Sequence, residues 1–290
     1  SRSSSPSLTV MAMTPFVLGL EYASRDVFLI IPFLVPSTMY VLLMYSSSLR
    51  FLTLRYVLIL SSGSMFMTFW IARPFALDLG VNTLELDLQI SQDGQIVVSH
   101  DPYFHHRYAI RPDGSNIQKD DPKEYIYTMP YSEVVKYDVG SRPSEVWPEK
   151  ACIKTVKPLA SDLIDFVENY TKENGLSPVR YNIEIKSKDA KGEGQNWPTY
   201  DRFVSECCKF LHSKHLGDRL VVQSFDVRAL NYMHEKYPEF ILSYLVDAKA
   251  PDFDTYMGML EFTPQWLSPH HSITDEELVK KCHEKGMKIV

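Results

Sequence analysis

Hydrophobic and polar residues alternate with two different periods beyond residue 72. Strand signals occupy residues 83–90, where apolar and polar residues alternate with a period of two, and residues 181–187, 219–225, 241–246, 265–269 and 287–290. Stretches with the helical period lie between or before them, at residues 161–175, 199–215, 226–238 and 274–286. Strands separated by helices of this length imply right-handed crossovers and a parallel sheet. The pattern therefore predicts an α/β fold. By itself it leaves open whether the sheet is an eight-stranded barrel or a doubly wound sheet.

The first of these strands is expected to continue into a hairpin. Asp93 and Gly94 form a turn signal after residues 83–90, and residues 96–102 read as the returning strand. The next stretch, residues 103–158, is polar, rich in proline and tyrosine, and shows little periodicity. Loops of this length are usually functional or ordered by their partners, so we predict a long excursion from the sheet.

Residues 1–72 differ from the rest of the chain because they contain long uncharged runs. Residues 27–49 and 56–72 carry no charge, and Arg50 and Arg55 lie between them. A membrane-spanning helix needs about 20 mostly apolar residues, so the first run qualifies and the second is slightly short. A two-span membrane anchor is one interpretation. The others are a buried hydrophobic element, an uncleaved secretory signal, and a segment that is not native to the domain behind it.

Membrane insertion would also predict an orientation for the rest of the chain. Arg50 and Arg55 favour a cytoplasmic linker between the two spans. Residues 73–290 would then lie on the outer face of the membrane. This interpretation favours a membrane-associated or a periplasmic or extracellular location over a cytoplasmic one.

Charge and cysteine content narrow the choice of function. The net charge of the 290 residues is −6. Residues 1–72 hold four arginines and two acidic residues, which leaves 26 basic and 34 acidic residues for the remainder. An acidic chain of this kind argues against nucleic acid as a partner. The four cysteines show no CxxC spacing, so we expect them to be buried free thiols.

Polar residues interrupt two strands that should be apolar in a parallel sheet. Glu85 and Asp87 are two residues apart in one strand, and Asn182, Glu184 and Lys186 are spaced in the same way in the next. A period of two places each set on one face of its strand. If that face lines the inside of a barrel, the three carboxylates converge near its mouth.

Three carboxylates held close together repel one another unless a cation neutralises them. Because only oxygen ligands are on offer, a hard ion such as Mg²⁺ or Ca²⁺ fits better than Zn²⁺. Lys186 supplies a further positive charge for an anionic substrate oxygen. His100 is followed by Asp101, which can fix the tautomer of the imidazole. The combination predicts a phosphate site, although each motif alone is common on solvent-facing strands.

Residues 80–102, GVNTLELDLQISQDGQIVVSHDP, resemble the signature of the glycerophosphodiester phosphodiesterases, which are TIM barrels. The resemblance continues through residues 181–186, 221–226 and 267–269 and covers about residues 75–290. It implies a TIM (β/α)8-type barrel over residues 73–290, behind a hydrophobic segment at residues 1–72. Residues 103–158 correspond to the insertion that caps the barrel mouth in the family.

The resemblance also implies a reaction and roles for single residues. The reaction is metal-dependent hydrolysis of a glycerophosphodiester to sn-glycerol 3-phosphate and an alcohol, in lipid metabolism. Glu85, Asp87 and Glu184 correspond to ligands of Mg²⁺ or Ca²⁺. Lys186 corresponds to a phosphate contact, and His100 to one of two catalytic histidines.

The sequence departs from the family pattern near both ends. The family opens with an HRG motif and then PENT, which supply the first catalytic histidine, whereas the first histidine of this chain is His100. After residue 290 the family would continue with an eighth strand. We therefore expect an incomplete barrel with two free edges, unless the hydrophobic segment replaces the first strand. We also expect low activity.

Two other functions are compatible with the same residues. One is a membrane-associated, non-catalytic module that binds phospholipid headgroups through a cation and Lys186, with residues 27–72 as the membrane contact. The other is a barrel enzyme that isomerises or cleaves a phosphosugar. It ranks last because the sequence shows no base for that chemistry.

Overall fold

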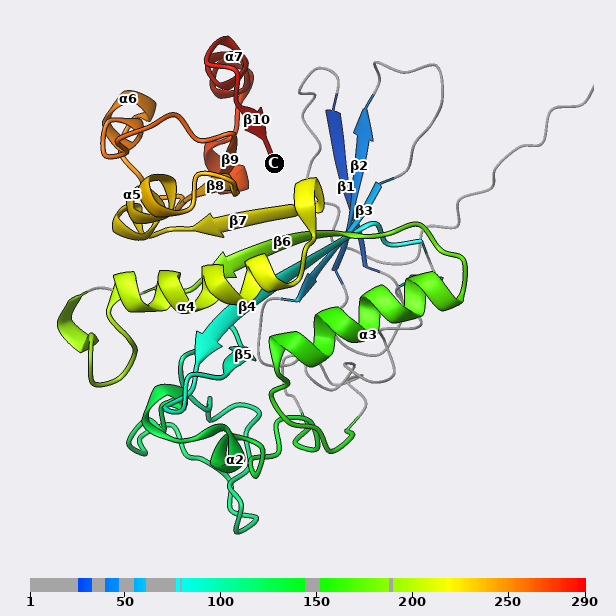
Figure 1. Ribbon diagram of the computed structural model, residues 1–290, viewed down its shortest axis with the longest axis vertical. Helices are drawn as coiled ribbons and strands as arrows, with labels where there is room; N and C mark the ends of the chain where they lie inside the picture. Colours follow the sequence, from blue (N-terminus) through cyan, green and yellow to red (C-terminus); the bar gives the residue numbers. More distant parts are fainter. Residues whose placement is uncertain are drawn as a thin grey trace, which may run out of the picture.

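A ten-stranded sheet organises the fold (Figure 1). The structure is a computed structural model that describes residues 26–32, 40–46, 55–60, 77–78, 80–143, 152–187 and 190–290. Seven strands run parallel to one another, in the order β3 (Arg55–Leu60), β4 (Thr83–Ile90), β6 (Arg180–Ile185), β7 (Leu220–Ser224), β8 (Ile241–Val246), β9 (Trp266–Pro269) and β10 (Lys288–Ile289). Three further strands pair antiparallel: β1 (Asp26–Pro32), β2 (Tyr40–Ser46) and β5 (Ile96–Val98).

Helices connect the parallel strands as the sequence predicted. They are α3 (Ala160–Glu173), α4 (Tyr200–Ser213), α5 (Val227–Lys236), α6 (Phe253–Met257) and α7 (Glu276–Glu284). The short helices are α2 (Tyr131–Val134), η2 (Ile126–Thr128), η3 (Ala190–Gly192), η4 (Gly217–Arg219) and η5 (His271–Ile273). The sequence did not predict α6, because five residues are too few to display a helical period.

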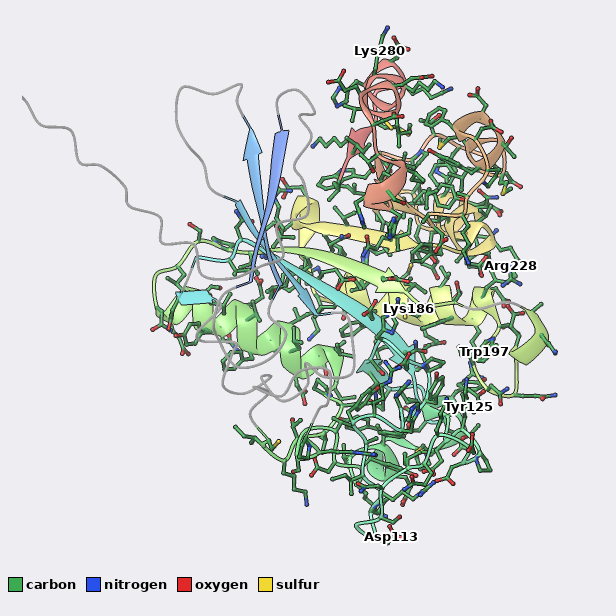
Figure 2. The ribbon with its side chains drawn as sticks, turned by 180° about the vertical axis from the view of Figure 1, so that it is seen from behind. Asp113, Tyr125, Lys186, Trp197, Arg228 and Lys280 are labelled. Atoms are coloured by element: carbon green, nitrogen blue, oxygen red, sulfur yellow. The ribbon has the colours of Figure 1, made fainter. Side chains whose placement is uncertain are left out.

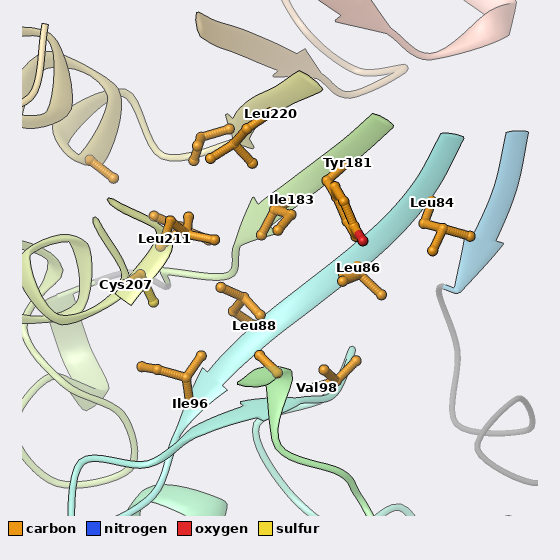
Figure 3. Packing of buried hydrophobic residues seen from close by; sticks show 14 of the residues in the cluster. Leu84, Leu86, Leu88, Ile96, Val98, Tyr181, Ile183, Cys207, Leu211 and Leu220 are labelled. Carbon is orange, nitrogen blue, oxygen red and sulfur yellow. The ribbon is translucent and has the colours of Figure 1, made fainter. Parts of the chain in front are cut away.

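The alternation of side chains along β4 determines which face of the sheet holds the carboxylates. Leu84, Leu86 and Leu88 are buried on one face, with Tyr181 and Ile183 of β6 beside them. Figure 3 shows this face turned toward Cys207 and Leu211 of α4. Burying each such side chain contributes about 1.5–3 kcal/mol, so a slip of one residue in register is strongly disfavoured. The intervening residues, Glu85 and Asp87, must therefore face the other side of the sheet.

Parallel strands that alternate with helices are the arrangement of a TIM-type barrel. Among the described strands, β1 ends the strand order on one side and β10 ends it on the other, and the two are not paired with each other. The described strands therefore form an open sheet. β3 lies parallel to β4, with Leu58 opposite Leu84, so residues 55–60 provide the strand that borders β4 on the side away from β6.

The prediction of two membrane-spanning helices in residues 27–49 and 56–72 is not supported. The described residues of these runs belong to strands β1, β2 and β3. Among the residues that the structure describes, no helix combines the length and the apolar character needed to cross a membrane. The other residues of the 1–72 segment lie outside the described residues. Apolar runs of this kind do not reveal by periodicity whether they form helix or strand, and the free edge of β4 offers a partner.

The described parts of residues 103–158, which are residues 103–143 and 152–158, lie between β5 and α3 and are called the insertion below. Figure 1 shows it beside the end of the sheet that holds β4 and β5. Its described part contains only the short helices η2 and α2. Tyr125 of the insertion packs edge-on against Trp197, with ring centroids 6.0 Å apart (Figure 2), and Arg202 Nη1 donates to Tyr127 Oη at 3.0 Å. The insertion therefore touches the segment that follows β6.

All four cysteines are free thiols, as predicted. Cys207, Cys208 and Cys282 are buried, whereas Cys152 is exposed. The expectation of burial was wrong for Cys152 because this residue lies in the insertion, outside the regular helices.

Candidate functional site

Three carboxylates meet on the face of the sheet opposite the leucines. Glu85 and Asp87 come from β4, and Glu184 comes from β6, where it lies directly opposite Asp87 in the strand register. One carboxylate oxygen from each lies within 4.8 Å of the others. The exposed fractions are 6% for Glu85, 0% for Asp87 and 6% for Glu184. The structure thus brings the three predicted ligands together.

Burial and mutual repulsion disfavour the charged forms of this triad. Burial, followed by the charges of Asp87 and Glu184, raises the pKa of Glu85 well above its ordinary value. Burial also raises the pKa of Glu184 to about 7, although Lys186 acts in the opposite direction. Within the part of the chain that the structure describes, Glu85 Oε2 and both carboxylate oxygens of Asp87 accept no hydrogen bond. Buried oxygens that accept no hydrogen bond fit a hard divalent cation.

Lys186 is the cationic neighbour of the triad. Its Nζ lies 3.0 Å from Glu184 Oε2 and 3.3 Å from Asp87 Oδ1, the second being an ion pair without hydrogen-bond geometry. Burial disfavours the ammonium charge, but the carboxylates of Asp87 and Glu184 outweigh this effect and raise the pKa of Lys186. One lysine against three carboxylates leaves a net negative site when all four groups are charged, so a bound cation would improve the charge balance.

An amide pair supports the triad from the neighbouring strands. Gln223 Nε2, on β7, donates to Glu85 Oε1 at 3.2 Å, and Asn182 Nδ2, on β6, donates to Gln223 Oε1 at 3.0 Å. Gln223 was not a predicted site residue. Its signal in the sequence is a polar residue within the otherwise apolar strand LVVQS, all of which is buried.

His100 lies at the opening of this site. Its side chain is 40% exposed, and Nδ1 lies 3.2 Å from Asp101 Oδ1. Burial alone would raise the pKa of Asp101, but the hydrogen bond and charge of His100 and the charge of Lys157 lower it to about 2. Asp101 is therefore an anion that can hold the imidazole in one orientation.

A cavity of about 640 Å³ extends from His100 to Glu184 of the triad. It is lined by His100, Glu184, Lys186, Ser187, Ala190, Phe225, Asp226 and Arg228. Figure 2 shows Lys186 at the end of β6 and Arg228 at the start of α5. The cavity thus opens at the carboxyl ends of the parallel strands, where TIM barrels carry their active sites.

The far wall of the cavity was not predicted from the sequence. Arg228 pairs with Asp226 at 2.7 Å and with Glu193 at 2.9 Å. Phe225 beside it is 49% exposed. Glu193 lies in the segment that follows β6, whereas Phe225 and Asp226 follow β7 and Arg228 lies in the first turn of α5, so only the fold brings these residues together.

Repulsion within the triad predicts a pH dependence of stability. In the metal-free chain, the folded pKa of Glu184, about 7, exceeds its ordinary value of 4.5. The folded state therefore binds more protons than the unfolded state between these values, and the free energy of unfolding contributed by this group falls as pH rises through them. Because a cation can take the place of the proton, we expect saturating divalent cation to raise Tm more at pH 8 than at pH 5. Thermal unfolding with chelator and with cation measures this, and equal increments at both pH values would contradict it.

Comparisons with known proteins agree with this geometry. The model of the glycerophosphoryl diester phosphodiesterase family matches residues 75–290. A glycerophosphodiester phosphodiesterase of Bacillus subtilis is 25% identical over 209 residues, which are 70% of this chain and 64% of the relative. One from Caldanaerobacter subterraneus is 23% identical over 214 residues, 74% of each chain. The present chain thus spans less than two thirds of the length of the Bacillus relative.

Solved structures show the same fold. A Silicibacter pomeroyi structure that carries the same family description is similar with a TM-score of 0.66 and 21% identity, over 80% of each chain. An Oleispira antarctica phosphodiesterase, solved in complex with the product sn-glycerol-3-phosphate, is similar with a TM-score of 0.58 and 21% identity, over 80% of this chain and 82% of that one. Fold, acidic site and family match lead to the same conclusion: the chain belongs to the glycerophosphoryl diester phosphodiesterase family.

Proposed function

We propose that this chain hydrolyses glycerophosphodiesters to sn-glycerol 3-phosphate and an alcohol. The observation that carries the proposal is the buried triad of Glu85, Asp87 and Glu184 beside Lys186, at the mouth of a TIM-type barrel. Membership of the family and the product bound to the Oleispira antarctica relative support the substrate class.

The triad would hold one divalent cation, Mg²⁺ or Ca²⁺. Its ligands are all oxygens, and its unpartnered oxygen atoms are buried, which fits these ions and disfavours thiol-seeking metals. When bound, such a cation offsets negative charge on the phosphoryl oxygens. The amide chain from Asn182 through Gln223 holds Glu85 in place for this role.

The side chains around the cavity supply binding and proton transfer. Lys186 is placed to bind an anionic phosphoryl oxygen, because its ammonium lines the cavity beside the triad. His100 acts as a general acid or base on the substrate or the attacking water. Its hydrogen bond with Asp101 occupies Nδ1, so Nε2 is the atom left to exchange a proton with the reacting groups.

Release of sn-glycerol 3-phosphate from glycerophosphocholine and glycerophosphoethanolamine tests the proposal. After chelator treatment we expect turnover only when Mg²⁺ or Ca²⁺ is restored. We expect this turnover to be low, because residues 1–99 hold no histidine that could act with His100, and the loss of one acid–base partner typically costs about 10²–10⁴-fold in rate.

A restored chain separates low activity from a wrong assignment. Placing an HRG-to-PENT segment ahead of Leu77 should raise the rate with both substrates. The absence of product from this restored chain in the presence of both metals would overturn the proposal. Metal-dependent binding without turnover would point instead to a non-catalytic headgroup-binding module.

A further inference from the structure

Lys157, near the end of the insertion, is fully buried, with an exposed fraction of 0%. An ammonium group is costly to remove from water, and burial lowers the pKa of Lys157 to about 7 although Asp101 opposes the shift. The burial of this lysine therefore does not by itself stabilise the folded chain. The contacts of its side chain show which residues it positions.

The ammonium of Lys157 begins a chain of hydrogen bonds that passes through Ser99 to the residues around His100. Nζ donates to Ser99 Oγ at 2.5 Å, and Ser99 Oγ donates to the carbonyl oxygen of Asp101 at 2.6 Å. The backbone nitrogen of Ser99 donates to the carbonyl oxygen of Asp87 at 2.9 Å. Ser99 is thus fixed to the strand of the triad on one side and to Lys157 on the other.

Two aromatic rings complete the pocket around this ammonium. Nζ lies 5.4 Å from the ring centroid of Phe104 and 5.5 Å from that of Tyr108. Tyr108 Oη donates to Asp101 Oδ2 at 3.4 Å, while Asp101 Oδ1 faces His100 Nδ1. Asp101 therefore has one oxygen toward His100 and one toward Tyr108, and the positive charge of Lys157 nearby stabilises its anion.

The backbone around Lys157 is anchored independently of its side chain. Tyr131 Oη donates to the carbonyl oxygen of Lys157 at 3.1 Å. The carbonyl oxygen of Pro158 accepts a hydrogen bond at 2.9 Å from the backbone nitrogen of Val98, at the end of β5. A change confined to the side chain of Lys157 should therefore leave the path of the insertion in place.

We propose that Lys157 is a positioning residue that holds Ser99 and Asp101, and through them the imidazole of His100, at the edge of the substrate cavity. The insertion then takes part in the reaction by orienting a proton-transfer group, in addition to shaping the cavity opening. The catalytic part of this inference rests on the proposed function.

Lys157→Met tests the role, because methionine has a similar length and carries no charge. In the full chain with saturating Mg²⁺ or Ca²⁺, we expect kcat for glycerophosphocholine to fall about 10- to 100-fold, as displaced catalytic groups do, with KM and metal affinity unchanged. Tm should stay the same or rise, since a buried charge is removed. Lys214→Met removes another largely buried lysine, which follows α4 and pairs with Asp165 of α3; it lies outside the residues that line the cavity, so it is the matched control and should leave kcat unchanged.

A His100→Ala background shows whether Lys157 acts through His100. We expect Lys157→Met to cause no further loss of kcat there. A loss of similar size in both backgrounds, or a fall in Tm that accounts for the lost activity, would overturn the positioning role.

A readout that needs no turnover keeps the inference separate from the proposed function. In ¹⁵N NMR spectra of the imidazoles at a pH where they are neutral, we expect His100 to show one tautomer, with the proton on Nδ1. Lys157→Met and Ser99→Ala should each shift the His100 signals toward the mixed tautomers of an exposed histidine such as His283. Unchanged His100 signals in both variants would overturn the inference. If no variant turns over any glycerophosphodiester while the signals shift, the proposed function fails and the positioning of His100 by Lys157 stands.

Discussion

Asp87→Asn is expected to lower kcat/KM for glycerophosphocholine by about 10³-fold, which corresponds to about 4 kcal/mol of lost transition-state stabilisation. Asp87 is fully buried between the other two carboxylates, and neither of its oxygens accepts a hydrogen bond from the described residues. Asparagine has the same shape but lacks the charge that a divalent cation requires. Steady-state assays of sn-glycerol 3-phosphate release, with the cation titrated, measure the effect.

The same substitution should act on stability in the opposite direction. In the presence of a chelator, Asp87→Asn removes one of three carboxylates that repel one another in a buried site, so we expect its Tm to exceed that of the unchanged chain. Added cation should then no longer raise Tm. Asp120→Asn, at an exposed position of the insertion, is the matched control and should change neither activity nor the response to cation. An Asp87→Asn chain that binds the cation as tightly as the unchanged chain would contradict the assignment of the triad.

His100→Ala is expected to lower kcat by about 10²–10⁴-fold, while the affinity for the cation and KM stay nearly unchanged. The reason is that His100 lines the cavity and is oriented by Asp101, but it is not among the three clustered carboxylates. His212→Gln, at an exposed position of α4, is the matched control and should retain full activity. Full activity of His100→Ala with glycerophosphocholine would contradict the role of His100.

The leaving group distinguishes the two roles open to His100. A p-nitrophenyl diester of glycerol phosphate releases an alcohol that needs no protonation. If His100 protonates the leaving oxygen, the loss in His100→Ala should be much smaller with this substrate than with glycerophosphocholine. If His100 activates the attacking water, both substrates should lose activity to a similar degree.

The acidic site could be predicted because its geometry follows from local pattern alone. Glu85 and Asp87 share a face by the period of the strand, and parallel pairing of β4 with β6 is sufficient to place Glu184 opposite Asp87. The flanking leucines and isoleucines fix which face is inward, since burial of the wrong set would be costly. These arguments need only the pairing of two neighbouring parallel strands, β4 and β6.

The rest of the site depends on contacts between segments that are far apart in sequence. Arg228 meets Glu193 only because the loops after β6 and β7 converge at the cavity. Lys157 gives no sign of burial in the sequence, because it lies in a stretch without periodicity and its partner Ser99 is 58 residues away. The hydrophobic segment was ambiguous for another reason: uninterrupted apolar runs have no periodicity, so the positions at which such a run divides into strands cannot be read from the sequence.

The binding of cation and phosphate at one place is the central claim, and Mn²⁺ used as a paramagnetic probe tests it most directly. With Mn²⁺ bound to the chelator-treated full chain, we expect the ³¹P relaxation of added sn-glycerol 3-phosphate to be strongly enhanced. In Asp87→Asn it should fall to the level that Mn²⁺ produces in buffer alone. Equal enhancement in the two chains, or Mn²⁺ binding without any effect on the phosphate, would contradict a phosphate site built on Glu85, Asp87 and Glu184.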